Sequence, residues 1–210
     1  MKAIRLIALA ACMAATLDAS AQEQEIRLFS HRGGRMEHDE NTLSAFQASY
    51  DAGYRGFETD IRMTRDGALV ITHDSSLERT TDGTGTVEEK TEAEIRRLHT
   101  KQGNKVLFLD ELLEFLEGKE GLYVEFEMKT KPEALYPEER LHAYCDKLYD
   151  AVMAVKPADA TFVFTSGDYR GLRYLQAKHP GVDLLLITSK PCNDETICLL
   201  YTSDAADDKA

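Results

Sequence analysis

The chain has no tryptophan, few prolines and few cysteines, and these scarcities narrow the class of protein. Its 210 residues include 5 prolines, 13 glycines and 4 cysteines, with no internal repeat and no low-complexity linker. A collagen-like repeat and a disordered chain are therefore excluded. With 43% hydrophobic and 30% charged residues, the composition is that of one globular domain with a sizeable core.

Positive charge is also scarce. Lys and Arg number 25 against 37 Asp and Glu, which gives a formal net charge of -12. A protein that binds nucleic acid through a broad basic face needs clustered Lys and Arg, so this class is disfavoured. If the substrate is a phosphate ester, a metal ion or a few well-placed cations must meet its charge.

The cysteines carry no recognisable chemistry. Cys12 lies in an apolar N-terminal segment and Cys198 in an atypical tail. Cys145 and Cys192 match no close-spaced zinc pattern, and in an oxidising compartment they could be either free or bridged.

The first 21 residues have the pattern of an export signal. A positively charged start precedes an apolar run, Leu6 to Leu17, and the small-residue cleavage site Ala19-Ser20-Ala21. This pattern predicts a signal peptide over 1–21, a periplasmic or secreted protein, and no membrane span after its removal. One alternative is a lipobox at Leu9 to Cys12, which would leave Cys12 acylated and anchored, and another is a buried helix.

Strand-like and helical segments alternate from residue 26 onward, with a polar loop excursion over 74–103. Such alternation indicates a parallel α/β sheet or barrel. We expect strands at 26–30, 56–64, 68–73, 122–128, 161–165 and 182–188, and helices at 43–52, 92–98, 138–155 and 169–179.

The last residues differ from the rest. Residues 198–210 resemble a translated adapter from DNA sequencing libraries, although a genuine acidic tail is the alternative. This resemblance predicts a non-native tail after a domain spanning 22–197. That domain is shorter than the roughly 250 residues of a complete (β/α)8 barrel. We therefore expect an incomplete barrel that lacks its closing strands, folds poorly and exposes two sheet edges.

Two carboxylates, Glu58 and Asp60, lie two residues apart in a strand-like segment. The two-residue period of a strand puts both on one face. The flanking Phe57 and Ile61 suggest that the segment is buried, where paired carboxylates need a nearby cation to stay charged.

A histidine is expected beside this pair. If Thr64 and Gly67 face each other across a hairpin turn, Ile71 lies opposite Asp60 and His73 opposite Glu58. Cross-strand partners on one face have Cβ atoms about 4.5–5.5 Å apart. His73 would then share a substrate with a metal held by the acids.

A third acid, Glu127, shares a strand face with Glu125 and Lys129. This pattern is unfavourable in a buried strand unless the strand lines a polar site. Oxygen ligands of this kind suit Mg²⁺ or Ca²⁺ better than zinc. Arg32 and Lys129, together with His31, would complete a phosphate site, because arginine binds phosphate through two hydrogen bonds and lysine as a point charge.

Taken together, these motifs resemble the glycerophosphodiester phosphodiesterase family over about residues 26–188. The ordered set is specific, whereas each piece alone is weak. It consists of His31-Arg32-Gly33, Glu40-Asn41-Thr42, Glu58-Thr59-Asp60, Thr64-Arg65-Asp66-Gly67, His73-Asp74, Arg79-Thr80-Thr81 and Glu127-Met128-Lys129. One departure is Asp39, where the family usually has proline, which leaves the conformation of this loop open.

The resemblance implies a (β/α)8 TIM barrel that hydrolyses glycerophosphodiesters to glycerol 3-phosphate and an alcohol. It implies one divalent cation, Mg²⁺ or Ca²⁺, as cofactor, and a small-molecule glycerophosphodiester as partner. Its implied site residues are an acid/base pair, three metal ligands and two phosphate contacts: His31 and His73; Glu58, Asp60 and Glu127; and Arg32 and Lys129.

Several alternatives stay open at this point. A related phospholipase-type lyase acting on intact lipid would use the same histidines and acids. A non-catalytic binding protein could share the barrel, because fold does not fix function. The residues leave undecided which histidine is acid and which is base, and whether water or a neighbouring glycerol hydroxyl attacks the phosphorus. The headgroup and the oligomeric state are also open.

Overall fold

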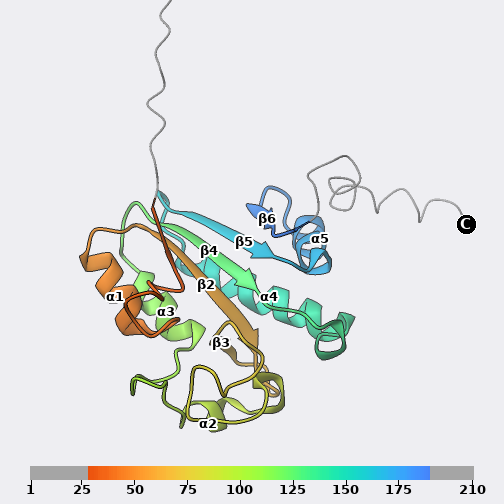
Figure 1. Ribbon diagram of the computed structural model, residues 1–210. Helices are drawn as coiled ribbons and strands as arrows, with labels where there is room; N and C mark the ends of the chain where they lie inside the picture. The colour runs from red at the N-terminus through yellow and green to blue at the C-terminus, as the bar shows by residue number, and fades with distance from the viewer. Residues whose placement is uncertain (1–27, 190–210) are drawn as a thin grey trace, which may run out of the picture.

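The computed structural model describes residues 28–189, which form an open, mostly parallel α/β sheet (Figure 1). The parallel strands lie in the order β1-β2-β4-β5-β6, and β3 pairs antiparallel to β2. Their bounds are β1 Phe29–His31, β2 Gly56–Met63, β3 Leu69–Ile71, β4 Tyr123–Met128, β5 Thr161–Ser166 and β6 Leu184–Leu186. Within the described residues the sheet does not close on itself, so it corresponds to part of a barrel wall.

Helices pack against one side of this sheet and build a single main core with it. The main helices are α1 Leu43–Asp51, α3 Leu109–Leu116, α4 Glu138–Val155 and α5 Tyr169–Lys178. A short helix α2, Glu92–Ile95, and the 3-10 turns η1, Val87–Glu89, and η2, Glu133–Leu135, lie in the connections. A smaller core beneath the 74–103 excursion includes Val70, Ile95 and Phe108.

The alternation of side chains along the strands separates this core from a polar face. On β2, Phe57 and Ile61 point into the main core, as Phe126 does on β4. The intervening residues therefore point to the opposite face. The carboxylates at positions 58, 60 and 127 reach the concave side of the sheet in this way.

Most of the predicted elements are present, with small differences at their ends. The helix expected over 138–155 has these bounds, whereas the one expected over 92–98 ends at Ile95. Helix α3 was not predicted, although its sequence carries a clear signal. Its buried residues Leu109, Leu112, Leu113 and Leu116 have helical spacing, and Glu111 accepts a hydrogen bond from the backbone N–H of Phe108 at 3.0 Å.

The predicted register of the β2–β3 hairpin is wrong by one residue. Ile71 lies opposite Ile61, not Asp60, and the N–H of Thr72 donates to the carbonyl of Asp60 at 2.9 Å. The turn closes between Thr64 and Ala68, whose backbone hydrogen bond measures 2.8 Å, so that it contains three residues. Gly67, with φ of 89°, adopts the left-handed conformation that such a three-residue loop requires.

Several sequence predictions lie outside the described residues: the signal peptide over 1–21, acylation of Cys12, any role of Cys192, and the tail from Cys198. Cys145 is described, and it is a free thiol buried beneath α5. Among the described helices, none combines the length and apolar character needed to cross a bilayer.

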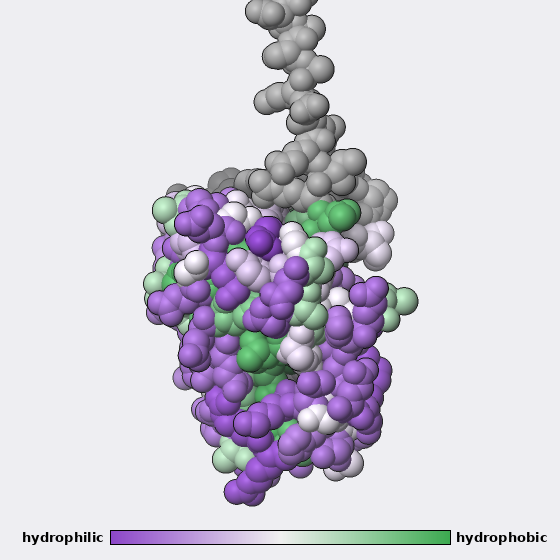
Figure 2. Space-filling model, turned by 90° about the vertical axis from the view of Figure 1, so that its left-hand side faces the viewer, coloured by the Kyte–Doolittle hydropathy of each residue, from purple (hydrophilic) through white to green (hydrophobic). Residues whose placement is uncertain are grey.

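The face on the side of α1 is largely hydrophilic, with an apolar band along its middle (Figure 2).

We predict that Phe126→Ala strongly destabilises the fold. Phe126 is fully buried, and its ring lies 5.3 Å from that of Phe162 and 6.1 Å from that of Phe164. The cavity should lower the free energy of unfolding by about 3–5 kcal/mol, as measured by urea denaturation. Met153→Ala, at an exposed position on α4, is the control and should change stability by about 0.5 kcal/mol or less. Equal losses in the two variants would contradict this account of the core.

Candidate active site

The candidate site lies on the concave face of the sheet, where β1 and β4 end beside the middle of β2. His31 ends β1 in register with Glu58, and Asp60 on β2 is in register with Glu127 on β4. Strand pairing therefore brings together side chains that lie up to about a hundred positions apart in the chain. Ligands of parallel α/β sheets bind at this end of the strands.

Three carboxylates meet there. One oxygen from each of Glu58, Asp60 and Glu127 lies within 4.8 Å of the others, and the first two side chains are buried. These are the three acids predicted from the sequence, and the structure brings all of them together.

The electrostatics of this group favour an additional cation. Burial raises the pKa of Glu58 to about 8, and the neighbouring charge of Asp60 adds to the effect. Oxygen Oε1 of Glu58 is buried and has no hydrogen-bond partner among the described residues. Without a cation, Glu58 either takes up a proton or leaves a buried carboxylate oxygen unpaired. A hard divalent ion bound through oxygen would neutralise the charge and pair this oxygen.

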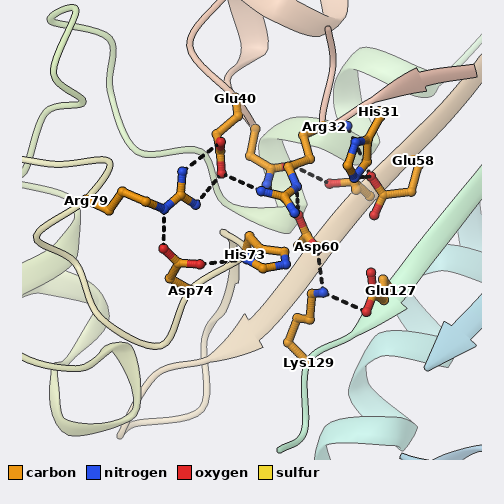
Figure 3. Close-up of polar contacts among 12 residues, drawn as sticks. His31, Arg32, Glu40, Glu58, Asp60, His73, Asp74, Arg79, Glu127 and Lys129 are labelled. Carbon is orange, nitrogen blue, oxygen red and sulfur yellow. Dashed lines mark hydrogen bonds and ion pairs between the residues drawn. The ribbon is translucent and has the colours of Figure 1, made fainter. Parts of the chain in front are cut away.

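The two predicted phosphate contacts lie beside the acids (Figure 3). The Lys129 ammonium is 2.6 Å from Glu127 and 3.1 Å from Asp60. Arg32 is buried, with Nε 3.3 Å from Asp60 and its backbone N–H donating to Glu58 at 3.1 Å. Arg32 has φ of 54°, a left-handed conformation that is uncommon outside glycine. The strained backbone directs both its N–H and its side chain into the site.

Both predicted histidines face the same cluster (Figure 3). His31 is half exposed, and its Nε2 is 3.5 Å from Glu58. Partial burial, followed by the charges of Arg32 and Arg35, lowers the pKa of His31, which favours its neutral form. His73 Nδ1 lies 2.6 Å from Asp74, a contact that orients the ring and leaves Nε2 available. His73 enters the site from the loop after β3, and not by the cross-strand pairing with Glu58 that the sequence suggested.

Four further residues take part in the site, beyond those predicted from the sequence. Asn41 donates to Asp60 at 2.8 Å. Glu40 accepts from Arg32 at 3.0 Å and from Arg79 at 2.7 Å, and Arg79 also bonds Asp74. These four residues could have been predicted from the sequence, because all of them belong to the motifs that carry the family resemblance.

These contacts form a chain of alternating charge that joins the surroundings of the two histidines (Figure 3): Arg32, Glu40, Arg79, Asp74 and His73. The hydrogen bond from Arg79, helped by the one from His73, lowers the pKa of Asp74 to about 2. Asp74 is therefore anionic at neutral pH and can stabilise a protonated His73.

Asp39, the position at which family members usually have proline, has a defined role in the structure. Its Oδ2 accepts hydrogen bonds from the Thr100 hydroxyl, from the Gln102 N–H at 3.1 Å and from the Asn104 amide at 3.2 Å. These bonds tie the loop before α1 to the 99–105 segment. The loop that carries Glu40 and Asn41 is thereby held without a proline.

The arrangement can perform acid/base chemistry on a phosphate ester. The three acids can hold a metal ion, Arg32 and Lys129 can meet negative phosphate oxygens, and two imidazoles are available for proton transfer. Water reaches the site, because His31 and His73 are partly exposed.

Comparison with known proteins agrees with this geometry. The sequence model of the "Glycerophosphoryl diester phosphodiesterase family" matches residues 31–207. A glycerophosphodiester phosphodiesterase of Caldanaerobacter subterraneus subsp. tengcongensis is 36% identical over 123 residues, which cover 54% of this chain and 50% of the relative. The chain spans about half the length of the curated relatives it matches.

Solved structures show the same architecture. A glycerophosphodiester phosphodiesterase from Agrobacterium tumefaciens is 28% identical, with a TM-score of 0.62 over 76% of this chain and 66% of that one. For an Oleispira antarctica phosphodiesterase in complex with the product sn-glycerol-3-phosphate, the identity is 24% and the TM-score 0.72, over 82% of this chain and 70% of that one. The expected (β/α)8-type fold class is thus confirmed, as an open sheet in the described residues.

We predict that the metal-free protein loses stability as the pH rises from about 5 to about 8. Folding raises the pKa of Glu58 from 4.5 to about 8. Between these values the folded state holds a proton that the unfolded chain has released, so rising pH favours unfolding. Urea denaturation at pH 5 and pH 8 in the presence of a chelator should show this loss, and Glu58→Gln should reduce it. Glu114→Gln, exposed on α3, should not. An equal loss in wild type and Glu58→Gln would show that Glu58 is ionised throughout.

Proposed function

The chain belongs to the glycerophosphoryl diester phosphodiesterase family, and on this premise we propose that it hydrolyses glycerophosphodiesters to glycerol 3-phosphate and an alcohol. One observation carries the proposal. Glu58, Asp60 and Glu127 converge within 4.8 Å beside two imidazoles and two cationic side chains. These are the parts that hydrolysis of a phosphodiester needs: charge neutralisation, phosphate contacts and a pair of proton-transfer groups.

The cofactor in this proposal is one divalent cation, Mg²⁺ or Ca²⁺. Glu58, Asp60 and Glu127 would hold it, because carboxylate oxygens are the ligands that both ions prefer. When bound, such an ion supplies charge neutralisation at a phosphoryl oxygen. The unpaired Oε1 of Glu58 and the raised pKa of this side chain support the assignment.

The chain's own residues bind the phosphate and move protons. Arg32 and Lys129 contact the phosphoryl oxygens and place the phosphorus between the two imidazoles. One of the two histidines, His31 or His73, accepts the proton of the attacking group, and the other protonates the leaving alkoxide. The attacking group is water or the neighbouring glycerol hydroxyl; in the second case water then opens the cyclic phosphate to give glycerol 3-phosphate. Asp74 orients the His73 ring through its contact with Nδ1 and stabilises its charged form.

Export to the periplasm or the medium is part of the proposal. It is supported by the signal-like pattern of residues 1–21, with a lipid anchor at Cys12 as the alternative. Such a location would give the site access to glycerophosphodiesters derived from membrane lipids outside the cytoplasm.

We expect metal-dependent release of glycerol 3-phosphate from glycerophosphocholine. A chelator should abolish the release, and Mg²⁺ or Ca²⁺ should restore it, because the three acids otherwise repel one another. Glu127→Gln should weaken restoration, whereas Glu114→Gln should not. Intact phosphatidylinositol, assayed in parallel, tests the lyase alternative. If a folded, metal-loaded protein cleaves only the intact lipid, or neither substrate, the proposal is wrong.

Loss of either histidine should lower kcat by about 100- to 10,000-fold, the usual contribution of a general acid or base. The variants are His31→Ala and His73→Ala, measured with glycerophosphocholine at saturating metal. His142→Ala is the matched control, because His142 lies on α4, stacked on Tyr174, away from the cluster. Full turnover in either site variant would remove that histidine from the mechanism.

A further inference from the structure

Arg62 is a buried charged residue that the proposed mechanism does not use. It follows Asp60 on the concave face of β2, and its side chain is only 8% exposed. Arg62 is not one of the cations that contact the three acids. Its burial, so close to the site, raises the question of what its charge does.

The guanidinium of Arg62 joins two residues of the site through their backbones. Its Nε donates to the carbonyl of His73 at 3.0 Å, and its Nη1 to the carbonyl of Lys129 at 3.3 Å. These carbonyls belong to separate segments, since His73 follows β3 and Lys129 follows β4. A rigid, planar group with several donors can hold two such acceptors at a fixed separation.

The guanidinium is itself fixed in place. Its Nη1 also donates to Glu88 at 2.8 Å, and the Glu88 side chain is almost fully buried. Glu88 accepts further hydrogen bonds from the hydroxyls of Ser75 at 2.7 Å and Tyr136 at 3.1 Å. Tyr136 in turn accepts from the backbone N–H of Met63 at 3.1 Å. Arg62 therefore belongs to a satisfied network with little freedom to move.

The contacts on the opposite side of His73 hold its ring and not its backbone. The His73 ring contacts Asp74, which is held by Arg79, but the Arg79 side chain is 48% exposed at the rim. The backbone before His73 is held to the sheet by the N–H of Thr72, which donates to the backbone carbonyl of Asp60 at 2.9 Å. Because the β3 ladder ends at Ile71, the carbonyl of His73 depends on Arg62.

We propose that Arg62 is a positioning residue, which sets the place of the His73 imidazole relative to the Lys129 ammonium by holding both backbones. This inference rests on the proposed function, in which His73 transfers a proton and Lys129 contacts phosphate. Stability alone is a weak reason for such a group, because a buried ion pair gains little over well-packed apolar residues. Displacement of a catalytic group by about 1 Å is enough to lower a rate by about 100-fold.

The test is Arg62→Lys, which keeps a positive charge beside Glu88 and so avoids an unpaired buried carboxylate. A single ammonium cannot reproduce the spread of donors on a guanidinium. We expect kcat/KM for glycerophosphocholine to fall about 10- to 100-fold while the circular dichroism spectrum stays that of the wild type.

Arg140→Lys is the matched control. Arg140 is also partly buried and also donates to two backbone carbonyls, those of Met63 and Thr64, both at 3.0 Å. These carbonyls belong to the hairpin and not to the site. Arg140→Lys should therefore change kcat/KM less than about threefold, and the unfolding midpoints of both variants, measured in parallel, separate a loss of activity from a loss of stability. Equal losses of activity in the two variants would reduce Arg62 to a structural role and overturn the proposal.

A second readout does not depend on turnover. In protein labelled with ¹⁵N-histidine, the His73 signals, identified by their absence in His73→Gln, should move in Arg62→Lys and stay in place in Arg140→Lys. Unchanged His73 signals in Arg62→Lys would overturn the inference, whatever the activity. If the wild type cleaves no diester, the proposed function fails, whereas the spectra still decide whether Arg62 positions His73.

Discussion

Repulsion among three carboxylates at one end of the sheet is the constraint on which the rest of the site depends. Their oxygens lie within 4.8 Å of one another, and two of the three side chains are buried, so that water screens them poorly. Arg32 and Lys129 supply positive charge on two sides. Even beside these cations, the pKa of Glu58 stays well above its usual range. The two positive charges of Arg32 and Lys129 thus do not neutralise the three carboxylates, and this deficit makes the cluster suitable for a divalent ion.

The residues around the three acids also pair positive with negative charges. Arg32 is shared between Asp60 and Glu40, and Arg79 between Glu40 and Asp74. Each guanidinium therefore lies between two carboxylates. The polar excursion over 74–103 supplies Asp74 and Arg79 to this network, and Glu88 to the separate network around Arg62.

The three acids of the site were predictable from the strand pattern, whereas His31, Arg32 and His73 were predicted from the chemistry and order of the motifs that contain them. Because side chains alternate along a strand, the spacing of Glu58 and Asp60 was enough to put both on one face, and parallel pairing brought in Glu127. The Arg62–Glu88 pair joins residues 26 positions apart through a 3-10 turn, and no periodic pattern indicates such a contact. Helix α3 is a different case, because the helical spacing of its apolar residues in the sequence was enough to predict it.

The error in the predicted hairpin register shows that the acids on the strands and His73 in the loop reach the site in different ways. A shift of one residue in a regular ladder moves every side chain to the opposite face. If the observed register continued past Ile71, His73 would lie opposite Thr59 and point away from the acids. His73 reaches the cluster nevertheless, because the ladder ends two residues earlier, at Ile71, and hydrogen bonds from Arg62 and to Asp74 determine its place. The acids therefore depend on strand pairing, and His73 depends on loop anchors. A substitution in the loops can consequently displace His73 while leaving the three acids in position.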